Sequence, residues 1–252
     1  MKEAIILGII QGIFEWFPVS SSGHLIIFQK FFNFKVDITF DVFLHLSSLV
    51  AIFIFFWKDI KEIGSKFFTF QKETYEFKIG IYIIISSIIT GFIGFFLKGH
   101  ITIFENFKLL SFAFLFTSIL LLLTGIKKIG KNRKVDIKTS FITGIFQGVA
   151  LLPGVSRSGA TICSCLIAGV NREDTFRYSF LLGIPAILGA IIIEIPEIKK
   201  LYNPTFLLTG FTISLFISFV SLFLLRRVFL RGKFYLFGFY TLLISIVLLF
   251  IQ

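Results

Sequence analysis

Runs of apolar residues alternate with short polar stretches along most of the chain, and six of these runs are long enough to cross a membrane. A helix needs about 20 mostly apolar residues to span the hydrocarbon core, which is about 30 Å thick. The pattern therefore predicts six transmembrane helices. They cover residues 40–57, 79–97, 109–126, 178–194, 205–225 and 234–251.

Four further apolar segments are too short to span a membrane, and they form two pairs. The pairs are 4–16 with 22–32, and 141–152 with 158–170. Pro18 and a serine run join the first pair, and Pro153 with Gly154 joins the second. Apolar pieces of about 10–14 residues that meet at Pro, Gly and Ser are typical of re-entrant helical hairpins. The alternative is two full spans, each broken near its middle.

The two short pairs share a sequence pattern. Gly-Ile-Ile-Gln-Gly at 8–12 recurs as Gly-Ile-Phe-Gln-Gly at 144–148, and in both copies Ser-Gly follows eleven residues after the Gln. Three predicted spans follow each copy. If each hairpin returns to its own side, an odd number of spans turns the second copy upside down, which is the inverted-repeat plan. We therefore expect a single membrane domain, residues 1–252, built from repeats 1–126 and 127–252.

The composition supports this fold class, an all-α polytopic membrane protein with six transmembrane helices and two re-entrant hairpins. Of the 252 residues, 56% are hydrophobic and 37 are Phe, and the mean hydropathy is +0.93. Charged residues make up 15%, where soluble domains carry about 25%. So few charges exclude a soluble or disordered chain. Cys163 and Cys165 lack the spacing of a metal site and are expected to be packing residues.

The net charge of +11 reflects membrane orientation and not a nucleic-acid partner, because the basic residues flank apolar segments. The side with 58–78, 127–140, 171–177 and 226–233 carries 17 of the 25 Lys and Arg. The positive-inside rule places this side in the cytoplasm and both termini outside. We expect a multi-pass protein of the cytoplasmic (inner) membrane.

Ionisable residues inside membrane segments are costly and are candidates for function. Here they concentrate at the two hairpins, with Glu15 and His24 in the first and Arg157 in the second. Inverted hairpins are expected to bring Arg157 toward Glu15 and His24. The alternative is a buried Glu–Arg pair that only locks the two halves together.

The second hairpin has the composition of an anion site. Gly154 allows close backbone approach, and the helix that follows would direct its free N–H groups at the loop. Arg157 offers a planar fork that matches phosphate oxygens. The hydroxyl groups of Ser156, Ser158 and Thr161 are expected to donate to the remaining oxygens.

The first hairpin offers the groups that hydrolysis needs. Gln11 and Glu15 are four residues apart and share a helical face, so their oxygens could hold a divalent cation together with phosphate. His24 is a candidate general base or acid. Ser21 or Ser22 is the candidate nucleophile within its reach.

These residues resemble a known family. The stretch Gln11-Gly-Ile-Phe-Glu-Trp-Phe-Pro-Val-Ser-Ser-Ser-Gly-His24 closely resembles the first signature of the undecaprenyl-diphosphate phosphatases, the bacitracin-resistance phosphatases. Residues 153–161 are similar to the second signature of that family. The resemblance covers essentially the whole chain. It implies a membrane hydrolase that converts undecaprenyl diphosphate to undecaprenyl phosphate and inorganic phosphate, and so recycles the lipid carrier of peptidoglycan precursors.

The resemblance also implies roles for single residues. It places the acid of the motif at Glu15, the proposed nucleophile at Ser21, the histidine at His24 and the phosphate-binding arginine at Arg157. The matching supporting hydroxyl residues are Ser156 and Thr161. It further implies dependence on Mg or Ca ions and a site that opens to the external face of the membrane.

One position departs from many family members, because Gln11 stands where a Glu is common. A neutral amide can ligate a cation but adds no charge. The sequence also leaves open whether Ser21 attacks phosphorus or His24 activates a water. Asp41 and His45 are either a second pair that reaches the pocket or a boundary Asp with a packed His, and His100 is expected to be solvated.

Inverted repeats with broken helices also suggest a transporter or flippase of polyprenyl phosphates. A transporter needs a binding pocket but neither a nucleophile nor a base, so the neighbourhood of Ser21 and His24 favours the enzyme. The expected partners are a polyprenyl diphosphate substrate and membrane lipids. An oligomer is compatible with the sequence.

Overall fold

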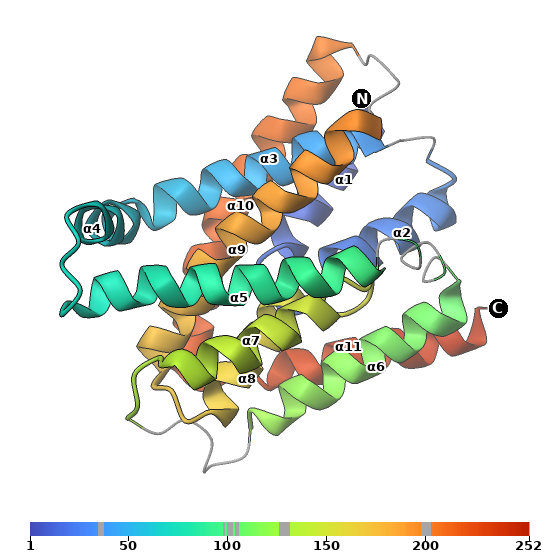
Figure 1. Ribbon diagram of the computed structural model, residues 1–252. Helices are drawn as coiled ribbons and strands as arrows, with labels where there is room; N and C mark the ends of the chain where they lie inside the picture. The colour runs from blue at the N-terminus through green and yellow to red at the C-terminus, as the bar shows by residue number, and fades with distance from the viewer. Residues whose placement is uncertain are drawn as a thin grey trace.

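The computed structural model describes residues 1–34, 38–97, 99, 103, 106–125, 132–197 and 203–251 (Figure 1). Apart from an isolated β-bridge, the elements within these residues are eleven α-helices and a short 3-10 helix, η2. In chain order they are α1 (Lys2–Phe14), α2 (Ser21–Phe32), α3 (Ile38–Phe55), α4 (Trp57–Phe68), α5 (Tyr75–Leu97), α6 (Phe107–Leu123), α7 (Ile137–Val149), α8 (Arg157–Ile167), α9 (Arg172–Glu194), η2 (Ile195–Glu197), α10 (Pro204–Leu230) and α11 (Leu236–Phe250).

Each of the six predicted spans corresponds to a helix, namely α3, α5, α6, α9, α10 and α11. By length and composition, α5, α9 and α10 can each cross a membrane, and α3 with α4 passes the same test as a pair bent by 77°. Helices α6 and α11 are apolar but shorter, with 17 and 15 residues. The chain is therefore an all-α, polytopic membrane protein with three or four helices of spanning length in its described part.

All four segments on the predicted cytoplasmic side contain helix, although they lie outside the predicted spans, and the last residues of segment 127–140 begin α7. Segment 58–78 holds most of α4 and the first turn of α5. Helix α4 is short and amphipathic and has no fully buried residue, so it contains no long apolar run by which it could be predicted. Segment 171–177 opens α9, where the Asn171 side chain accepts a hydrogen bond from the backbone N–H of Asp174. Most of segment 226–233 is the end of α10.

The four short apolar segments form two pairs of short helices, α1 with α2 and α7 with α8. They have 13, 12, 13 and 11 residues. At 1.5 Å per residue each is about 16–20 Å long, roughly half of the hydrocarbon core. The predicted breaks are therefore present, at residues 15–20 and 150–156.

The repeated Gly-x-x-Gln-Gly motif has a packing role in both copies. Helix α1 packs along α10, and α7 packs along α5. A Cβ atom added at Gly12 would lie 2.8 Å from the carbonyl oxygen of Ser214 on α10. One added at Gly148 would lie 2.8 Å from the Cβ of Ile93 on α5. Glycine is needed at both positions because the helix backbones approach so closely.

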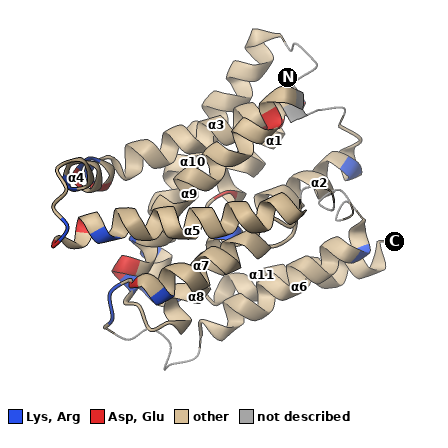
Figure 2. Ribbon diagram, in the orientation of Figure 1, with Lys and Arg blue, Asp and Glu red and all other residues tan. Residues whose placement is uncertain are grey.

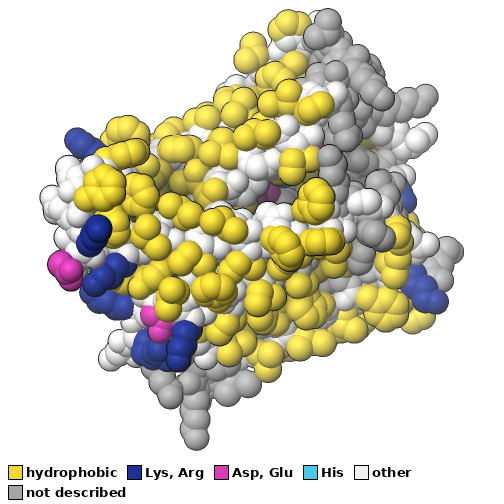
Figure 3. Space-filling model, in the orientation of Figure 1, with side chains coloured by type: hydrophobic (Ala, Val, Ile, Leu, Met, Phe, Trp, Pro, Cys, Tyr) yellow, Lys and Arg dark blue, Asp and Glu magenta, His cyan; other side chains and the backbone are white. Residues whose placement is uncertain are grey.

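Charged residues gather at one end of the molecule, around α4 and the starts of α5, α7 and α9 (Figure 2). Hydrophobic side chains cover the surface between this end and the opposite one (Figure 3). At the charged end Arg177 of α9 pairs with Asp59 of α4 and lies 3.7 Å from Glu76 of α5. These contacts hold α4 across the end of the helix bundle, where Figure 1 shows it end-on.

Candidate active site

The two helix breaks meet each other inside the protein. The backbone N–H of Gly154 donates to Ser20 Oγ at 3.1 Å, and Ser158 Oγ donates to the carbonyl of Trp16 at 3.1 Å. Thr117 of α6 fixes the second break, because its hydroxyl donates to the carbonyl of Gly154 at 2.9 Å. Gly154 has a φ of +91°, a conformation that favours glycine. The expected meeting of the hairpins is confirmed.

Glu15 lies at the centre of this meeting point, just after the end of α1. Ser21 Oγ donates to Oε2 at 2.7 Å, and Gln11 Nε2 donates to the same oxygen at 3.1 Å. Arg157 Nη2 donates to Oε1 at 3.0 Å. The side chain of Glu15 is 7% exposed. Burying a carboxylate is costly unless it is paired and hydrogen-bonded, so the three donors around Glu15 are a structural requirement as well as a chemical opportunity.

Arg157 uses only part of its hydrogen-bonding capacity. Its Nη2 contacts Glu15, whereas the buried Nη1 has no hydrogen-bond partner within the described residues. The guanidinium carbon lies 5.7 Å from the ring of Trp16. Gly183 of α9 makes room for it, because a Cβ there would lie 2.3 Å from Nη1. An anion such as phosphate could accept a hydrogen bond from the unused N–H of this planar fork.

The hydroxyl groups expected beside Arg157 are largely engaged elsewhere. Ser156 caps α8, since its Oγ accepts from the N–H of Gly159 at 3.1 Å. Thr161 Oγ1 donates to the carbonyl of Arg157 at 2.9 Å and contacts Ser179 Oγ at 2.5 Å. As already noted, the hydroxyl of Ser158 donates to Trp16. In this structure these groups shape and join the hairpins. Ser22 is exposed at the start of α2, with its Oγ 3.4 Å from Ser20 Oγ.

His24 is near the meeting point, but both of its ring nitrogens have other partners. Nδ1 donates to the carbonyl of Ser20 at 2.7 Å, because a carbonyl can only accept. Nε2 then accepts from the Tyr240 hydroxyl of α11 at 2.8 Å. The ring stacks on Phe14 at 4.0 Å and meets Phe114 edge-on. The described residues include no hydrogen bond from His24 to Glu15, Ser21 or Arg157.

His45 of α3 joins the Glu15 cluster. The sequence had left open whether this side chain reaches the pocket. Its Nδ1 lies 3.2 Å from Gln11 Nε2 and 3.9 Å from Glu15 Oε2. Asp41, one turn earlier, accepts instead from Gln29 at 3.5 Å. The only signal for His45 in the sequence was an ionisable side chain inside a predicted span. His100 lies outside the described residues.

The donor set at Gln11 and Glu15 is compatible with a divalent cation bound together with phosphate. Across the described part of the chain no group of three or more His, Cys, Asp and Glu side chains forms a ready-made metal site. Mg²⁺ is, however, commonly held by one or two carboxylates, with phosphate oxygens and water as the other ligands. Glu15 supplies the carboxylate, and Gln11 Oε1 is buried with no hydrogen-bond partner among the residues that the structure describes.

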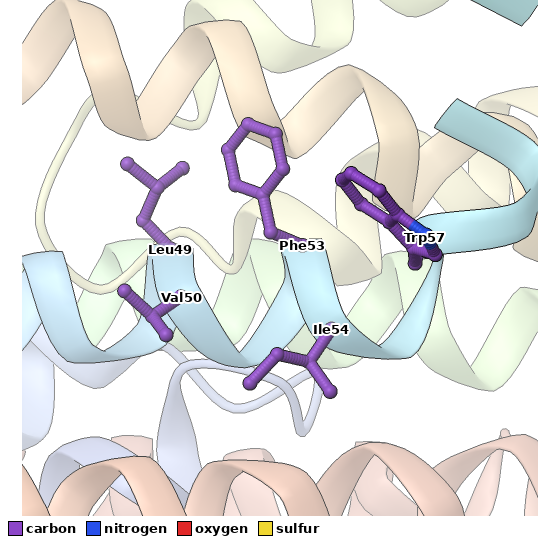
Figure 4. Close-up of a pocket in the computed structure, with 5 residues that line it drawn as sticks. All are labelled: Leu49, Val50, Phe53, Ile54 and Trp57. Atoms are coloured by element: carbon purple, nitrogen blue, oxygen red, sulfur yellow. The ribbon is translucent and has the colours of Figure 1, made fainter. Parts of the chain in front are cut away.

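An apolar groove lies on α3 beyond the polar cluster (Figure 4). Its volume is about 570 Å³, and it is lined by Leu49, Val50, Phe53, Ile54 and Trp57. With no charged lining residue it is unsuited to a diphosphate. Along α3 the first lining residue, Leu49, directly follows Ser48, whose Oγ accepts from Gln11 at 3.4 Å.

The fold and site together define an all-helical, polytopic membrane protein in which two pairs of short helices enclose a buried carboxylate and a guanidinium. The chain belongs to the bacitracin resistance protein BacA family, whose model matches residues 4–247. It is 40% identical over 250 residues to the undecaprenyl-diphosphatase of Thermosipho africanus, covering 98% of both chains. It is 38% identical over 263 residues to that of Methanosphaera stadtmanae, covering 97% of this chain and 95% of the other. It is also 38% identical over 249 residues to that of Treponema denticola.

Proposed function

We propose that this protein is an undecaprenyl-diphosphatase, which hydrolyses undecaprenyl diphosphate to undecaprenyl phosphate and inorganic phosphate. Family membership supports the activity. The observation that carries it is the Glu15 carboxylate, held between the hydroxyl of Ser21 and the guanidinium of Arg157, whose Nη1 is buried and unpaired within the described residues. This arrangement offers a proton acceptor, an oxygen nucleophile and a phosphate-binding fork in one buried site.

In this proposal Arg157 binds the terminal phosphate through the N–H group that has no protein partner. An oxygen nucleophile attacks the terminal phosphorus, and the bond from phosphorus to the bridging oxygen breaks, so that its electron pair leaves with undecaprenyl phosphate. Ser21 is the better-placed nucleophile, because its hydroxyl already donates to Glu15 at 2.7 Å and Glu15 can accept the proton. Water then cleaves the phosphoserine, and Ser21 regains its proton.

His24 is proposed to contribute at the same site by holding the start of α2. Its hydrogen bond to the carbonyl of Ser20 supports this role, because Ser20 has an unusual positive φ of 66° and immediately precedes the nucleophile. The alternative, in which His24 activates a water, requires Tyr240 to release Nε2. The hydroxyl groups of Ser22, Ser156, Ser158 and Thr161 and the backbone of Gly154 are proposed to line the phosphate site.

A divalent cation, Mg or Ca, is proposed to bind with the substrate at Gln11 and Glu15. When bound, it would neutralise charge on the phosphate oxygens. The apolar groove on α3 suits part of the prenyl tail, since it carries no charged lining residue and begins at Leu49, the residue after Ser48 of the polar cluster.

For the architecture, we propose six spans and two re-entrant hairpins in one domain, with repeats 1–126 and 127–252 inverted relative to each other. The protein would lie in the cytoplasmic membrane with its site open to the external face. Reporters at both termini are then expected to read as external, and reporters in the 127–140 segment as cytoplasmic. A cytoplasmic C-terminus would refute either the span count or the orientation.

The decisive experiment is phosphate release from undecaprenyl diphosphate by purified protein in detergent, with and without a chelator. We expect release that the chelator suppresses and added Mg²⁺ or Ca²⁺ restores. A transporter or flippase would release no phosphate. In cells, lipid-carrier recycling predicts that overproduction raises resistance to bacitracin, because the diphosphate would be removed.

A further inference from the structure

Helix α4 presents an outer face made of aromatic and basic side chains. Trp57, Lys61 and Phe68 are spaced four and seven residues apart, so they share one side of the helix. Trp57 is 60% exposed and Phe68 is 82% exposed. Lys58 is exposed beside them. A neighbouring side of the helix packs inward, through Ile60, Ile63 and Phe67.

The acidic residues of α4 do not neutralise these lysines. Asp59 pairs with Arg177 of α9, and Glu62 Oε2 lies 3.8 Å from Nη2 of the same arginine. Asp59 is thus drawn toward the protein, whereas the Glu62 side chain stays 55% exposed. Lys58 and Lys61 have no ion-pair partner within the described residues. Lys58, Lys61, Lys66 and Lys72 outnumber the exposed Glu62 and Glu73, so this segment carries net positive charge.

The turn after α4 extends this face. Phe70 has a positive φ of 52°, which is rare for a bulky residue, and its side chain is 73% exposed. Lys72 follows and is exposed as well. We define the α4 face as Trp57, Lys58, Lys61, Phe68, Phe70 and Lys72.

The orientation of α4 matches a membrane surface better than a span. It is bent by 77° from α3 and has only 12 residues, so it lies across the bundle at the charged end (Figures 1 and 2). Helices with aromatic side chains beside lysines lie in the interfacial plane, where the rings enter the headgroup region and the lysines attract anionic lipids. In the first half of the chain α4 lies between α3 and α5. In the second half, the described residues between α9 and α10 form only the short η2 turn.

We propose that the α4 face is a binding site for anionic phospholipids, with its lysines on the lipid phosphates and its aromatic rings in the headgroup region. The occupant is a lipid with a net negative headgroup at the membrane surface on the α4 side. The proposal rests on the charge, exposure and orientation of α4. Trp57 also lines the apolar groove on α3, so the headgroup preference is assigned to the lysines, and it is tested separately from the hydrolase activity.

Tryptophan fluorescence offers a direct test, because the chain has two Trp residues and Trp16 is buried. Trp16→Phe leaves Trp57 as the only reporter. The full chain is placed in phosphatidylcholine nanodiscs that contain a small fraction of quencher-labelled lipid, with either a phosphatidylglycerol or a phosphatidylcholine headgroup. We expect the anionic quencher to be enriched on the order of fivefold at Trp57 at low salt. The ratio should fall toward one at about 0.5 M salt, because screening shortens the reach of surface charges.

A triple variant, Lys58→Gln, Lys61→Gln and Lys72→Gln, should bring the quenching ratio close to one. The matched control replaces Lys2, at the start of α1, and Lys108, at the start of α6, by Gln, and it should keep the ratio of the parent. Thermal stability is recorded for all proteins to verify folding. A parent ratio of one, or an unchanged ratio in the triple variant, would overturn the proposal. Phosphate release is measured in parallel, so that loss of lipid preference is distinguished from loss of activity.

Discussion

The two helical hairpins share a scaffold. Aligned on their Gly-x-x-Gln-Gly motifs, both begin the second helix with a capping serine. Ser20 Oγ accepts from the N–H of Gly23 at 3.3 Å, and Ser156 Oγ accepts from the N–H of Gly159 at 3.1 Å. Such caps satisfy one of the free N–H groups of a helix start and are worth about 1 kcal/mol. The start of each second helix is therefore capped in the same way, although the backbone differs, with a φ of 66° at Ser20 and −73° at Ser156.

The same alignment shows where the hairpins differ. The aligned pairs that differ most in chemistry are Glu15 with Leu151, Ser21 with Arg157, and His24 with Ala160. The first hairpin supplies a carboxylate and a hydroxyl, and the second supplies a guanidinium. Neither hairpin contains both Glu15 and Arg157, so this ion pair forms only across the interface between the hairpins. A duplicated scaffold thus carries one asymmetric site.

Of the groups that distinguish the two hairpins, the carboxylate should have the largest effect on activity. Glu15→Gln should lower turnover by about 10²- to 10⁴-fold, because an amide cannot accept the proton of Ser21. The amide can still accept hydrogen bonds, so insertion and folding should persist. Phosphate release by the purified variant is the measurement. Leu151→Met, at the aligned position, is the control and should stay within a few-fold of the parent. Near-normal turnover of Glu15→Gln would remove this residue from the proposed mechanism.

The guanidinium should show the next largest effect. Arg157→Lys should be nearly as damaging as Arg157→Ala, because an ammonium cannot hold Glu15 and a phosphate oxygen in the same planar geometry. A charge-assisted hydrogen bond is worth roughly 1.5–3 kcal/mol, and about 1.4 kcal/mol corresponds to tenfold in rate. The expected loss is on the order of ten- to a hundredfold in phosphate release. If Lys restores most of what Ala removes, Arg157 is only a counter-charge that locks the hairpins together.

The hairpins and the long helices were predictable because their signals are local. Apolar run length located α5, α9 and α10, and the Pro, Gly and Ser residues between short runs located the two breaks. The contact between Glu15 and Arg157 was also expected, because two rare ionisable residues in membrane segments tend to pair.

The parts that sequence reasoning missed depend on tertiary packing. Helix α4 lacks a long apolar run and was expected to be a loop, although its outward face carries aromatic side chains. Gly183 is far along the chain from Arg157, and nothing in its surroundings indicates that it makes room for the guanidinium. The partners of His24 and His45 depend on which faces of α3 and α11 turn inward. A helix that is hydrophobic on all sides has no polar face in its sequence from which the inward side could be predicted.

The two motif glutamines allow a finer test of scaffold against chemistry. Gln11 Nε2 contacts Glu15 and Ser48, whereas Gln147 Nε2 donates to Thr90 at 3.1 Å. Both side chains are buried. Gln11→Leu should lower phosphate release about tenfold, since it removes a hydrogen bond to the carboxylate. Gln147→Leu should keep release within about threefold.

Thermal unfolding of the two glutamine variants separates the causes. Each loses buried hydrogen bonds of about 1 kcal/mol, so similar stability losses are expected. Equal losses of activity would show that both glutamines serve only the scaffold. In contrast, Gln11→Glu should retain activity, because it restores a carboxylate that is common in the family.

The smallest effect on activity should come from the glycines that open the two motifs. A Cβ at Gly8 would lie 2.8 Å from the carbonyl oxygen of Gly210, and a Cβ at Gly144 would lie 3.0 Å from that of Ser86. Gly8→Ala and Gly144→Ala should therefore each cost about 1–3 kcal/mol of stability through overpacking, and phosphate release should stay within a few-fold. Gly91→Ala on α5 is the control, because nothing lies within 4 Å of its added Cβ. Thermal unfolding of the three variants decides the matter. If only one of the two motif-glycine variants loses stability, the close packing of α1 on α10 is not equivalent to that of α7 on α5. The scaffold shared by the two hairpins is then confined to the breaks.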